Sequence, residues 1–77
     1  MAFGERVRHL REEQFLSMAE LAEKAGISKN TLFRVETGHY SAIPRTVRKI
    51  ADALGVAPGD LVTPDELRGL RGNAQAA

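Results

Sequence analysis

Between residues 29 and 37 the sequence spaces its polar side chains as one side of an α-helix would. At about 100° per residue, five residues fall within an arc of about 140°: Lys29, Asn30, Phe33, Arg34 and Thr37. Leu32 and Val35 point elsewhere. The arc offers ammonium, amide and guanidinium donors and no carboxylate, and such donors pair with base edges and phosphates. The spacing therefore predicts a helix with a surface suited to nucleic acid.

A second predicted helix, Met18–Ala25, would pack against the polar helix and position it. Its apolar residues recur at the i, i+3, i+4, i+7 spacing of a buried face: Met18, Leu21, Ala22 and Ala25. Ser17 before it and Glu20 three residues later form a capping-box pattern. Gly26 supplies the left-handed residue that lets the helix stop, and Ser28 is placed to cap the polar helix over residues 29–36. The two helices are therefore joined by a tight turn.

A packed helix, a glycine turn and a protruding helix with a polar tip are the parts of a helix-turn-helix motif, here residues 17–38. Other short patterns stand around it in order: Leu10-Arg11-Glu12-Glu13, Ser17-x-x-Glu20-Leu21-Ala22, Ala25-Gly26-Ile27-Ser28, Val35-Glu36-x-Gly38 and Ile50-Ala51-x-Ala53-Leu54-Gly55-Val56. With these patterns the chain resembles the Cro/repressor-like (XRE) helix-turn-helix family over residues 3–62. The resemblance implies an all-α fold, a compact bundle of five or six short helices of the lambda-repressor-like DNA-binding type.

The remaining helices follow from the apolar pattern. A first helix over Gly4–Gln14 has the inner stripe Phe3, Val7 and Leu10. A fourth, capped by Ser41 with Pro44 in its first turn, runs to about Leu54 and buries Val47, Ile50, Ala51 and Leu54. A short fifth helix or turn lies over residues 57–62, with Leu61 closing the core. We expect residues 1–62 to form the helix-turn-helix domain, 63–71 a C-terminal helix opened by a second capping box, and 72–77 a flexible tail.

Site roles follow from the resemblance and from side-chain chemistry. The expected base-reading residues are Lys29, Asn30, Phe33 and Arg34. The expected contacts to the DNA backbone or minor groove are Ser17, Met18, Ser28, His39, Tyr40 and Arg45. Phe33 either touches a thymine methyl or packs against a loop or a partner subunit. The resemblance also implies a structural ion pair between Arg11 and Glu36, which would neutralise the carboxylate at the end of the reading helix.

Two residues depart from the family pattern. Phe15 stands where glycine is usual after the first helix, so either the helix ends differently or the ring packs well enough to compensate. Met18 stands where the family often has a glutamine that reaches the DNA backbone. Its thioether favours core packing, but the backbone N–H groups of Met18 and Ala19 remain suited to a phosphate.

Composition narrows the class of protein. The chain has 77 residues and no cysteine, which predicts one small domain without disulfides or thiolate metal sites. No apolar run approaches the ~20 residues of a membrane span, and no signal-peptide core is present. No enzyme motif, metal-ligand cluster or cofactor-binding pattern occurs. Residues 28–49 hold five basic residues and one acidic residue, a local net charge of +4 within an overall +1. Such a cluster is typical of nucleic-acid contact and, by itself, equally of a solvated basic face.

These observations predict a sequence-specific double-stranded DNA-binding transcriptional regulator of the cytoplasmic nucleoid, a repressor or a small phage- or plasmid-type controller. We expect a homodimer on a two-fold operator. Leu67, Leu70 and the exposed side of Val62 are the dimer-contact candidates, although the two leucines would also suit packing against the first helix. The alternative is a protein-interaction module with a protein partner, such as the antitoxin of a toxin–antitoxin pair.

Overall fold

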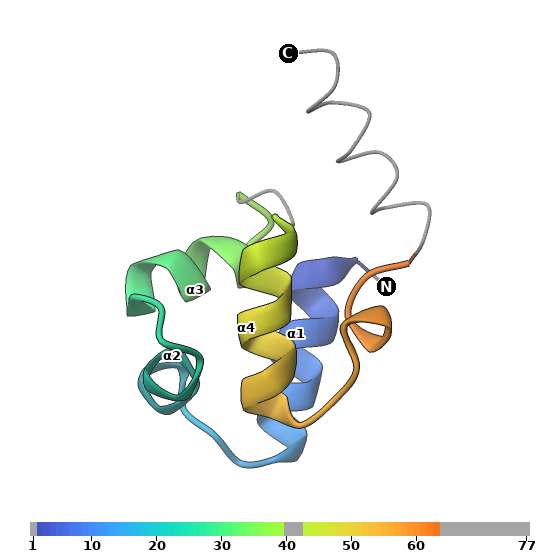
Figure 1. The fold of residues 1–77 in the computed structure, drawn as a ribbon. Coiled ribbons are helices and arrows are strands. Elements are labelled where there is room, and N and C mark those ends of the chain that lie inside the picture. Colours follow the sequence, from blue (N-terminus) through green and yellow to red (C-terminus); the bar gives the residue numbers. More distant parts are fainter. Residues whose placement is uncertain (1, 40–42, 64–77) are drawn as a thin grey trace.

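The computed structural model describes residues 2–39 and 43–63, which form four α-helices and one short 3₁₀ turn (Figure 1). In order these are α1 (Phe3–Glu13), α2 (Met18–Ala25), α3 (Lys29–Glu36), α4 (Pro44–Leu54) and η1 (Pro58–Asp60). Every regular element of these two ranges is helical, so the all-α prediction is confirmed. The count of five or six helices is not matched: the fifth is only η1, and the helix expected over residues 63–71 lies, except for Thr63, outside the described ranges.

One hydrophobic core holds the helices together. α4 packs on α2 and η1, while α3 packs on α1 and α2. Figure 1 shows α3 and η1 at opposite sides of the molecule, with α1 and α4 between them. The largest fully buried side chains are Leu21, Leu32, Ile50, Leu61, Val7 and Val35. The predicted apolar stripes of α2 and α4, together with Leu61, supply most of the core residues. Burial of these apolar side chains is the main favourable contribution to the free energy of folding.

All four α-helices end in a turn with a left-handed residue, which is the first residue after α2 and α4 and the second after α1 and α3. Three of these positions hold glycine: Gly26, Gly38 and Gly55, with φ of 70°, 82° and 73°. The fourth holds Phe15, with φ of 57°. At this end the Leu16 N–H donates to the Arg11 carbonyl at 3.1 Å, the bond that closes such a turn.

The Phe15 ring does not pack. Phe15 is 93% exposed, so both expectations for this residue are wrong: α1 ends in the left-handed turn usual for glycine, and no packing against residues 2–39 or 43–63 offsets the strain. A left-handed conformation costs an L-residue about 1–2 kcal/mol because Cβ approaches the following carbonyl oxygen.

Two side chains of α1 and its end tie distant parts of the chain together. The Gln14 Nε2 donates to the Leu54 carbonyl at 2.8 Å and so satisfies an acceptor at the end of α4. The Arg6 Nη1 donates to the Leu61 carbonyl at 2.8 Å, just beyond η1. Both hydrogen bonds join residues at least 40 positions apart, so α1 and the residue after it connect to the C-terminal part of the described chain.

Two predictions near α4 and η1 are wrong. The residue that precedes α4 is Ile43, not Ser41, because α4 begins at Pro44 and a residue before proline is pushed to extended conformation (φ −70°, ψ 131°). Ser41 itself lies outside the described residues. Val62 has no exposed side to offer a partner, since it is only 4% exposed and belongs to the core.

Candidate nucleic-acid interface

The two faces of α3 differ in chemistry as the spacing predicted. Leu32, Val35 and Glu36 are buried against the core. The four predicted base readers are exposed together on the other face: Lys29, Asn30, Phe33 and Arg34. Phe33 is 51% exposed, which is high for a large apolar residue. The open face of α3 therefore presents two cations, one amide and one aromatic ring.

The start of α3 is fixed by Ser28. Its Oγ accepts the Thr31 N–H at 3.0 Å, and its hydroxyl donates to Thr31 Oγ1 at 2.8 Å. Both roles of the hydroxyl are thus occupied by Thr31 in this structure. Ser28 therefore fixes the first turn of α3, which carries Lys29 and Asn30. A hydrogen bond from the Ser28 hydroxyl to DNA would have to replace its hydrogen bond to Thr31 Oγ1.

The start of α2 leaves two backbone donors open. Ser17 Oγ accepts the Glu20 N–H at 3.0 Å, and the Glu20 carboxylate accepts the Ser17 N–H at 2.9 Å, which completes the predicted capping box. The Ser17 hydrogen bond lowers the pKa of Glu20, so this carboxylate is charged near neutral pH. The N–H groups of Met18 and Ala19 are not used by the box and have no acceptor one turn earlier in the helix. The Met18 side chain is half-buried against the core, as its apolar character predicted.

Beyond α3, the structure places two of the three remaining predicted contacts. His39 is exposed, and its Nδ1 lies 3.0 Å from the Thr37 hydroxyl, which also donates to the Phe33 carbonyl at 2.8 Å. Arg45 is exposed in the first turn of α4. Tyr40 lies outside the described residues. The exposed cations therefore continue from α3 into α4.

An ion pair locks α3 to α1. The Arg11 Nε lies 2.8 Å from Glu36 Oε2 and its Nη2 lies 3.0 Å from Glu36 Oε1, a two-pronged contact. The third nitrogen of the guanidinium donates to the Leu16 carbonyl at 2.9 Å. The side chains are only 12% and 4% exposed, and the hydrogen bond to Glu36 raises the pKa of Arg11 against the opposing effect of burial. The one acidic residue between residues 28 and 49 is thus neutralised and turned inward.

Sequence reasoning missed a residue on which this arrangement depends. Gly4 is buried where α1 crosses the end of α3, and a Cβ added to it would lie 2.2 Å from the Val35 carbonyl oxygen. Only glycine lets the two backbones approach so closely. The available signal was a glycine inside the first turn of an otherwise regular amphipathic helix.

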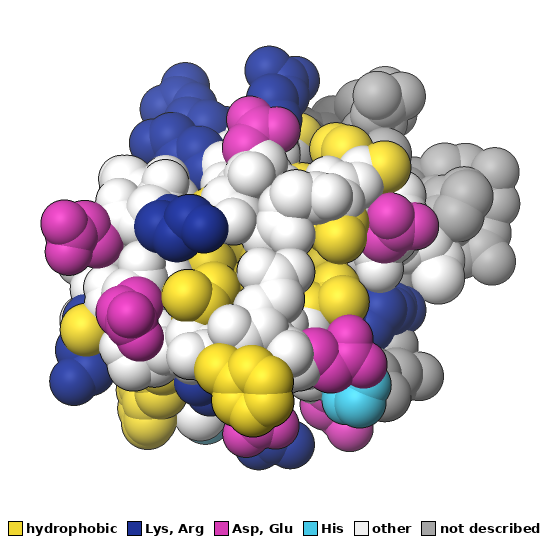
Figure 2. Space-filling view, turned by 90° about the horizontal axis from the view of Figure 1, so that it is seen from below, with side chains coloured by type: hydrophobic (Ala, Val, Ile, Leu, Met, Phe, Trp, Pro, Cys, Tyr) yellow, Lys and Arg dark blue, Asp and Glu magenta, His cyan; other side chains and the backbone are white. Residues whose placement is uncertain are grey.

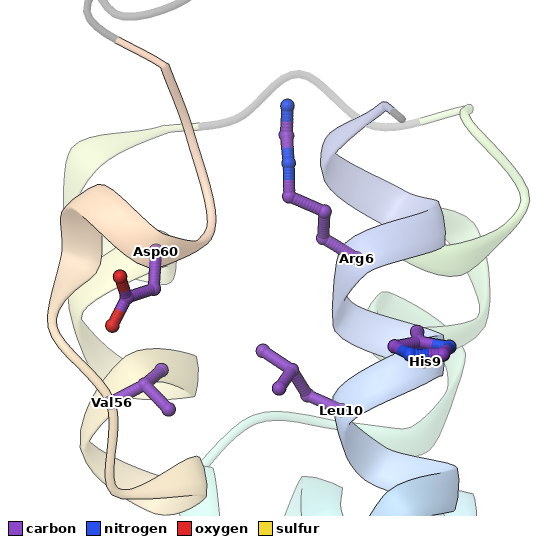
Figure 3. A pocket seen from close by; sticks show the side chains of 5 residues that line it. All are labelled: Arg6, His9, Leu10, Val56 and Asp60. Atoms are coloured by element: carbon purple, nitrogen blue, oxygen red, sulfur yellow. The ribbon is translucent and has the colours of Figure 1, made fainter.

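The described residues also contain a small cavity of about 270 Å³ between α1 and the segment that carries η1. Its lining residues are Arg6, His9, Leu10, Val56 and Asp60 (Figure 3). Figure 3 shows the side chains of Asp60 and Arg6 on separate walls, with their charged ends not directed at each other. This volume is below the ~300–1,000 Å³ typical of ligand sites.

Residues 2–39 and 43–63 contain neither a metal-ligand cluster nor a membrane-spanning helix. No group of three or more metal-ligating side chains gathers there. None of the helices in that part of the chain has the length and apolarity to cross a membrane.

Comparisons with known proteins agree with this geometry. The sequence profile of a family described as "Helix-turn-helix domain" matches residues 2–64. The immunity repressor protein of Bacillus phage phi105 is 33% identical over 67 residues, which cover 87% of this chain and 46% of that protein. The cryptic phage CTXphi transcriptional repressor RstR of Vibrio cholerae is 38% identical over 64 residues, which cover 83% of this chain and 58% of that protein. The chain therefore spans about half the length of these two curated relatives.

Among solved structures, the restriction-modification controller protein C.AhdI from Aeromonas hydrophila superposes with a TM-score of 0.75. Its sequence is 33% identical, and the match covers 78% of this chain and 91% of that one.

Proposed function

The chain belongs to the helix-turn-helix domain family, and from this premise we propose that it is a sequence-specific repressor that binds double-stranded DNA in the cytoplasmic nucleoid. In this motif the second helix enters the major groove with its N-terminal end foremost. Here that helix is α3, and Lys29 and Asn30 stand at its start. The names of the relatives, two phage repressors and a controller protein, support this role.

The observation that carries the proposal is the exposed polar face of α3 on a rigid support. Asn30 has the paired donor and acceptor that match adenine, while Arg34 has the donor fork that matches guanine. Phe33 offers an apolar edge to a thymine methyl group. The inward turn of Glu36 toward Arg11 removes the one carboxylate that would repel phosphates from this end of α3.

Backbone contacts would fix the register of α3 in the groove. We assign them to the α2 start, where Ser17 and the free N–H groups of Met18 and Ala19 meet one phosphate. His39 and Arg45 would follow the same DNA strand beyond α3, with Arg45 at the minor groove. These contacts carry little sequence information but supply much of the affinity.

The test begins with selection of bound duplexes from a random pool and proceeds to variants on the selected site. We expect Asn30→Ala and Arg34→Ala each to weaken binding by about 1–3 kcal/mol and to relax the preference at particular base pairs. Arg45→Ala should weaken binding on all sequences and reduce the slope of log affinity against log salt by about 1. Fluorescence anisotropy over a salt series measures both effects.

Lys24→Ala is the matched control, because Lys24 is an exposed cation of α2 outside the proposed contacts. It should leave both the affinity and the salt slope nearly unchanged, whereas Lys29→Ala should not. Absence of salt-dependent binding by the wild-type protein would contradict DNA binding and favour the interaction-module alternative. If Asn30→Ala and Arg34→Ala both selected the wild-type sequence, the base-reading assignment would be wrong.

We further propose that the protein binds as a homodimer to two half-sites about one helical turn apart, because a single eight-residue α3 offers few base contacts. The candidate contact is the sequence-predicted helix over residues 63–71 with Leu67 and Leu70, which lie outside the described residues. Sedimentation velocity should show a mass that rises from monomer to dimer between low and high micromolar concentration. Leu67→Glu with Leu70→Glu should abolish the rise, and Gln75→Ala should not. A strict monomer at high micromolar concentration would refute the dimer.

A further inference from the structure

Phe15 combines two features that both oppose folding. Its backbone is left-handed, with φ of 57°, and its ring is 93% exposed. It is the one residue other than glycine with positive φ in the described part of the chain. A bulky residue in this conformation is a genuine outlier, and such outliers concentrate where the chain meets a ligand.

The other helix ends show what the fold alone requires at this position. Gly26, Gly38 and Gly55 close the same type of turn without steric cost. A glycine at position 15 would close the α1 turn equally well, and no contact within residues 2–39 and 43–63 offsets the strain and exposure of Phe15. The advantage of the ring must therefore come from a contact with another molecule.

We propose that the Phe15 ring packs against a deoxyribose of the bound DNA, next to the phosphate held by the start of α2. The inference rests on the proposed function. Phe15 stands two residues before Ser17, so its Cα lies at most about 7 Å from that of the capping residue. A phosphate on the N–H groups of Met18 and Ala19 would place the adjacent sugar within reach of a phenyl ring. The ring would add an apolar contact at a point where the neighbouring contacts are polar.

The surroundings of Phe15 favour DNA over a protein surface as the occupant. Figure 2 views the molecule from below, the side that carries the α1–α2 connection in Figure 1. Hydrophobic side chains on this face are interleaved with acidic and basic ones (Figure 2). A stable protein interface needs an apolar centre and about 800 Å² on each partner, whereas a sugar needs one ring.

Two exposed carboxylates stand close to Phe15 in the sequence. The nearest carboxylates in sequence are those of Glu12 and Glu13, and the Glu13 carboxylate lies 3.0 Å from His9 Nε2. Because the ring itself is uncharged, its contact with a sugar should be insensitive to salt. It should also be insensitive to the base that the sugar carries.

The test is Phe15→Gly, measured for both stability and DNA binding. We expect the melting temperature of the free protein to stay the same or rise by a few degrees, since the strain is relieved. We expect affinity for the selected duplex to fall at least about fivefold, with the same factor on a scrambled duplex and an unchanged salt slope. Phe15→Ala removes the ring but keeps a Cβ, so it should lose affinity without gaining stability. Phe15→Leu should retain part of the affinity.

The possible outcomes separate this contact from the proposed function. If wild-type protein showed no salt-dependent binding to duplex DNA, both would fall together. If wild-type protein bound normally and Phe15→Gly bound equally well, the sugar contact alone would be overturned. A lower melting temperature for Phe15→Gly would mean that the ring packs within the chain. A changed sedimentation mass of the free variant would mean that the ring contacts a second copy of the protein. Either result would overturn the proposal.

Discussion

Arg11→Ala is expected to lower the free energy of unfolding by about 3–5 kcal/mol, because it leaves the Glu36 carboxylate buried without its partner. The same change removes the donor to the Leu16 carbonyl. A domain of 77 residues has a total stability of roughly 4–12 kcal/mol at 0.05–0.15 kcal/mol per residue, so the expected loss is at least about a quarter of the total. Urea denaturation followed by circular dichroism measures the loss.

Two control variants separate the charge from the geometry. Arg11→Lys keeps the positive charge but loses the two-pronged contact, so it should lie between wild type and Arg11→Ala. Arg11→Met combined with Glu36→Leu replaces both partners with apolar side chains, and this double variant should be more stable than Arg11→Ala. A loss below about 1 kcal/mol for Arg11→Ala would show that the pair behaves like an exposed one, and the buried geometry would be wrong.

The Arg11 result also bears on function. A chain without Arg11 that remained folded would carry an unpaired carboxylate at the end of α3, close to the proposed phosphate contacts. Its affinity for DNA should therefore fall even when binding is corrected for the folded fraction. Stability and binding are linked here because one guanidinium both braces α3 and neutralises its terminal acid.

Local signals in the sequence were sufficient to predict the bounds of α2 and α3, the two helices of the helix-turn-helix motif. The bounds of α2 and α3 agree with the prediction residue for residue. Both are set by nearby chemistry: Ser17 and Glu20 cap α2, Gly26 stops it, and Ser28 caps α3. The exposed face of α3 follows from helical spacing in the same way. Base reading by Lys29, Asn30 and Arg34 stays a prediction, because the exposure of a side chain does not identify the molecule that it binds.

Most of the features that sequence reasoning missed depend on which segments meet in space. The Gln14 bond to the Leu54 carbonyl and the Arg6 bond to the Leu61 carbonyl join parts of the chain 40 and 55 residues apart. No local pattern specifies such partners. The burial of Val62 has the same origin, since η1 folds this residue onto the core. The missed start of α4 was local, and the effect of Pro44 on Ile43 outweighed the capping preference of Ser41.

Gly4→Ala should destabilise the protein by about 3 kcal/mol or more, although helix propensity alone favours alanine over glycine by up to about 1 kcal/mol. The added Cβ would lie 2.2 Å from the Val35 carbonyl oxygen, which is backbone and cannot rotate aside as a side chain can. α1 and α3 would have to separate, and the Arg11–Glu36 contact, which bridges the same two helices, would lengthen with them.

Gly59→Ala is the matched control for this substitution, because a Cβ on Gly59 meets no atom within 4 Å and its φ is not positive. It should change the free energy of unfolding by less than about 0.5 kcal/mol or raise it slightly through a stiffer unfolded chain. The two substitutions add the same methyl group, so the difference between their denaturation midpoints measures the close approach of α1 and α3. Equal midpoints would show that the helices do not meet at Gly4, and the rigid support proposed for the reading face of α3 would lose its basis.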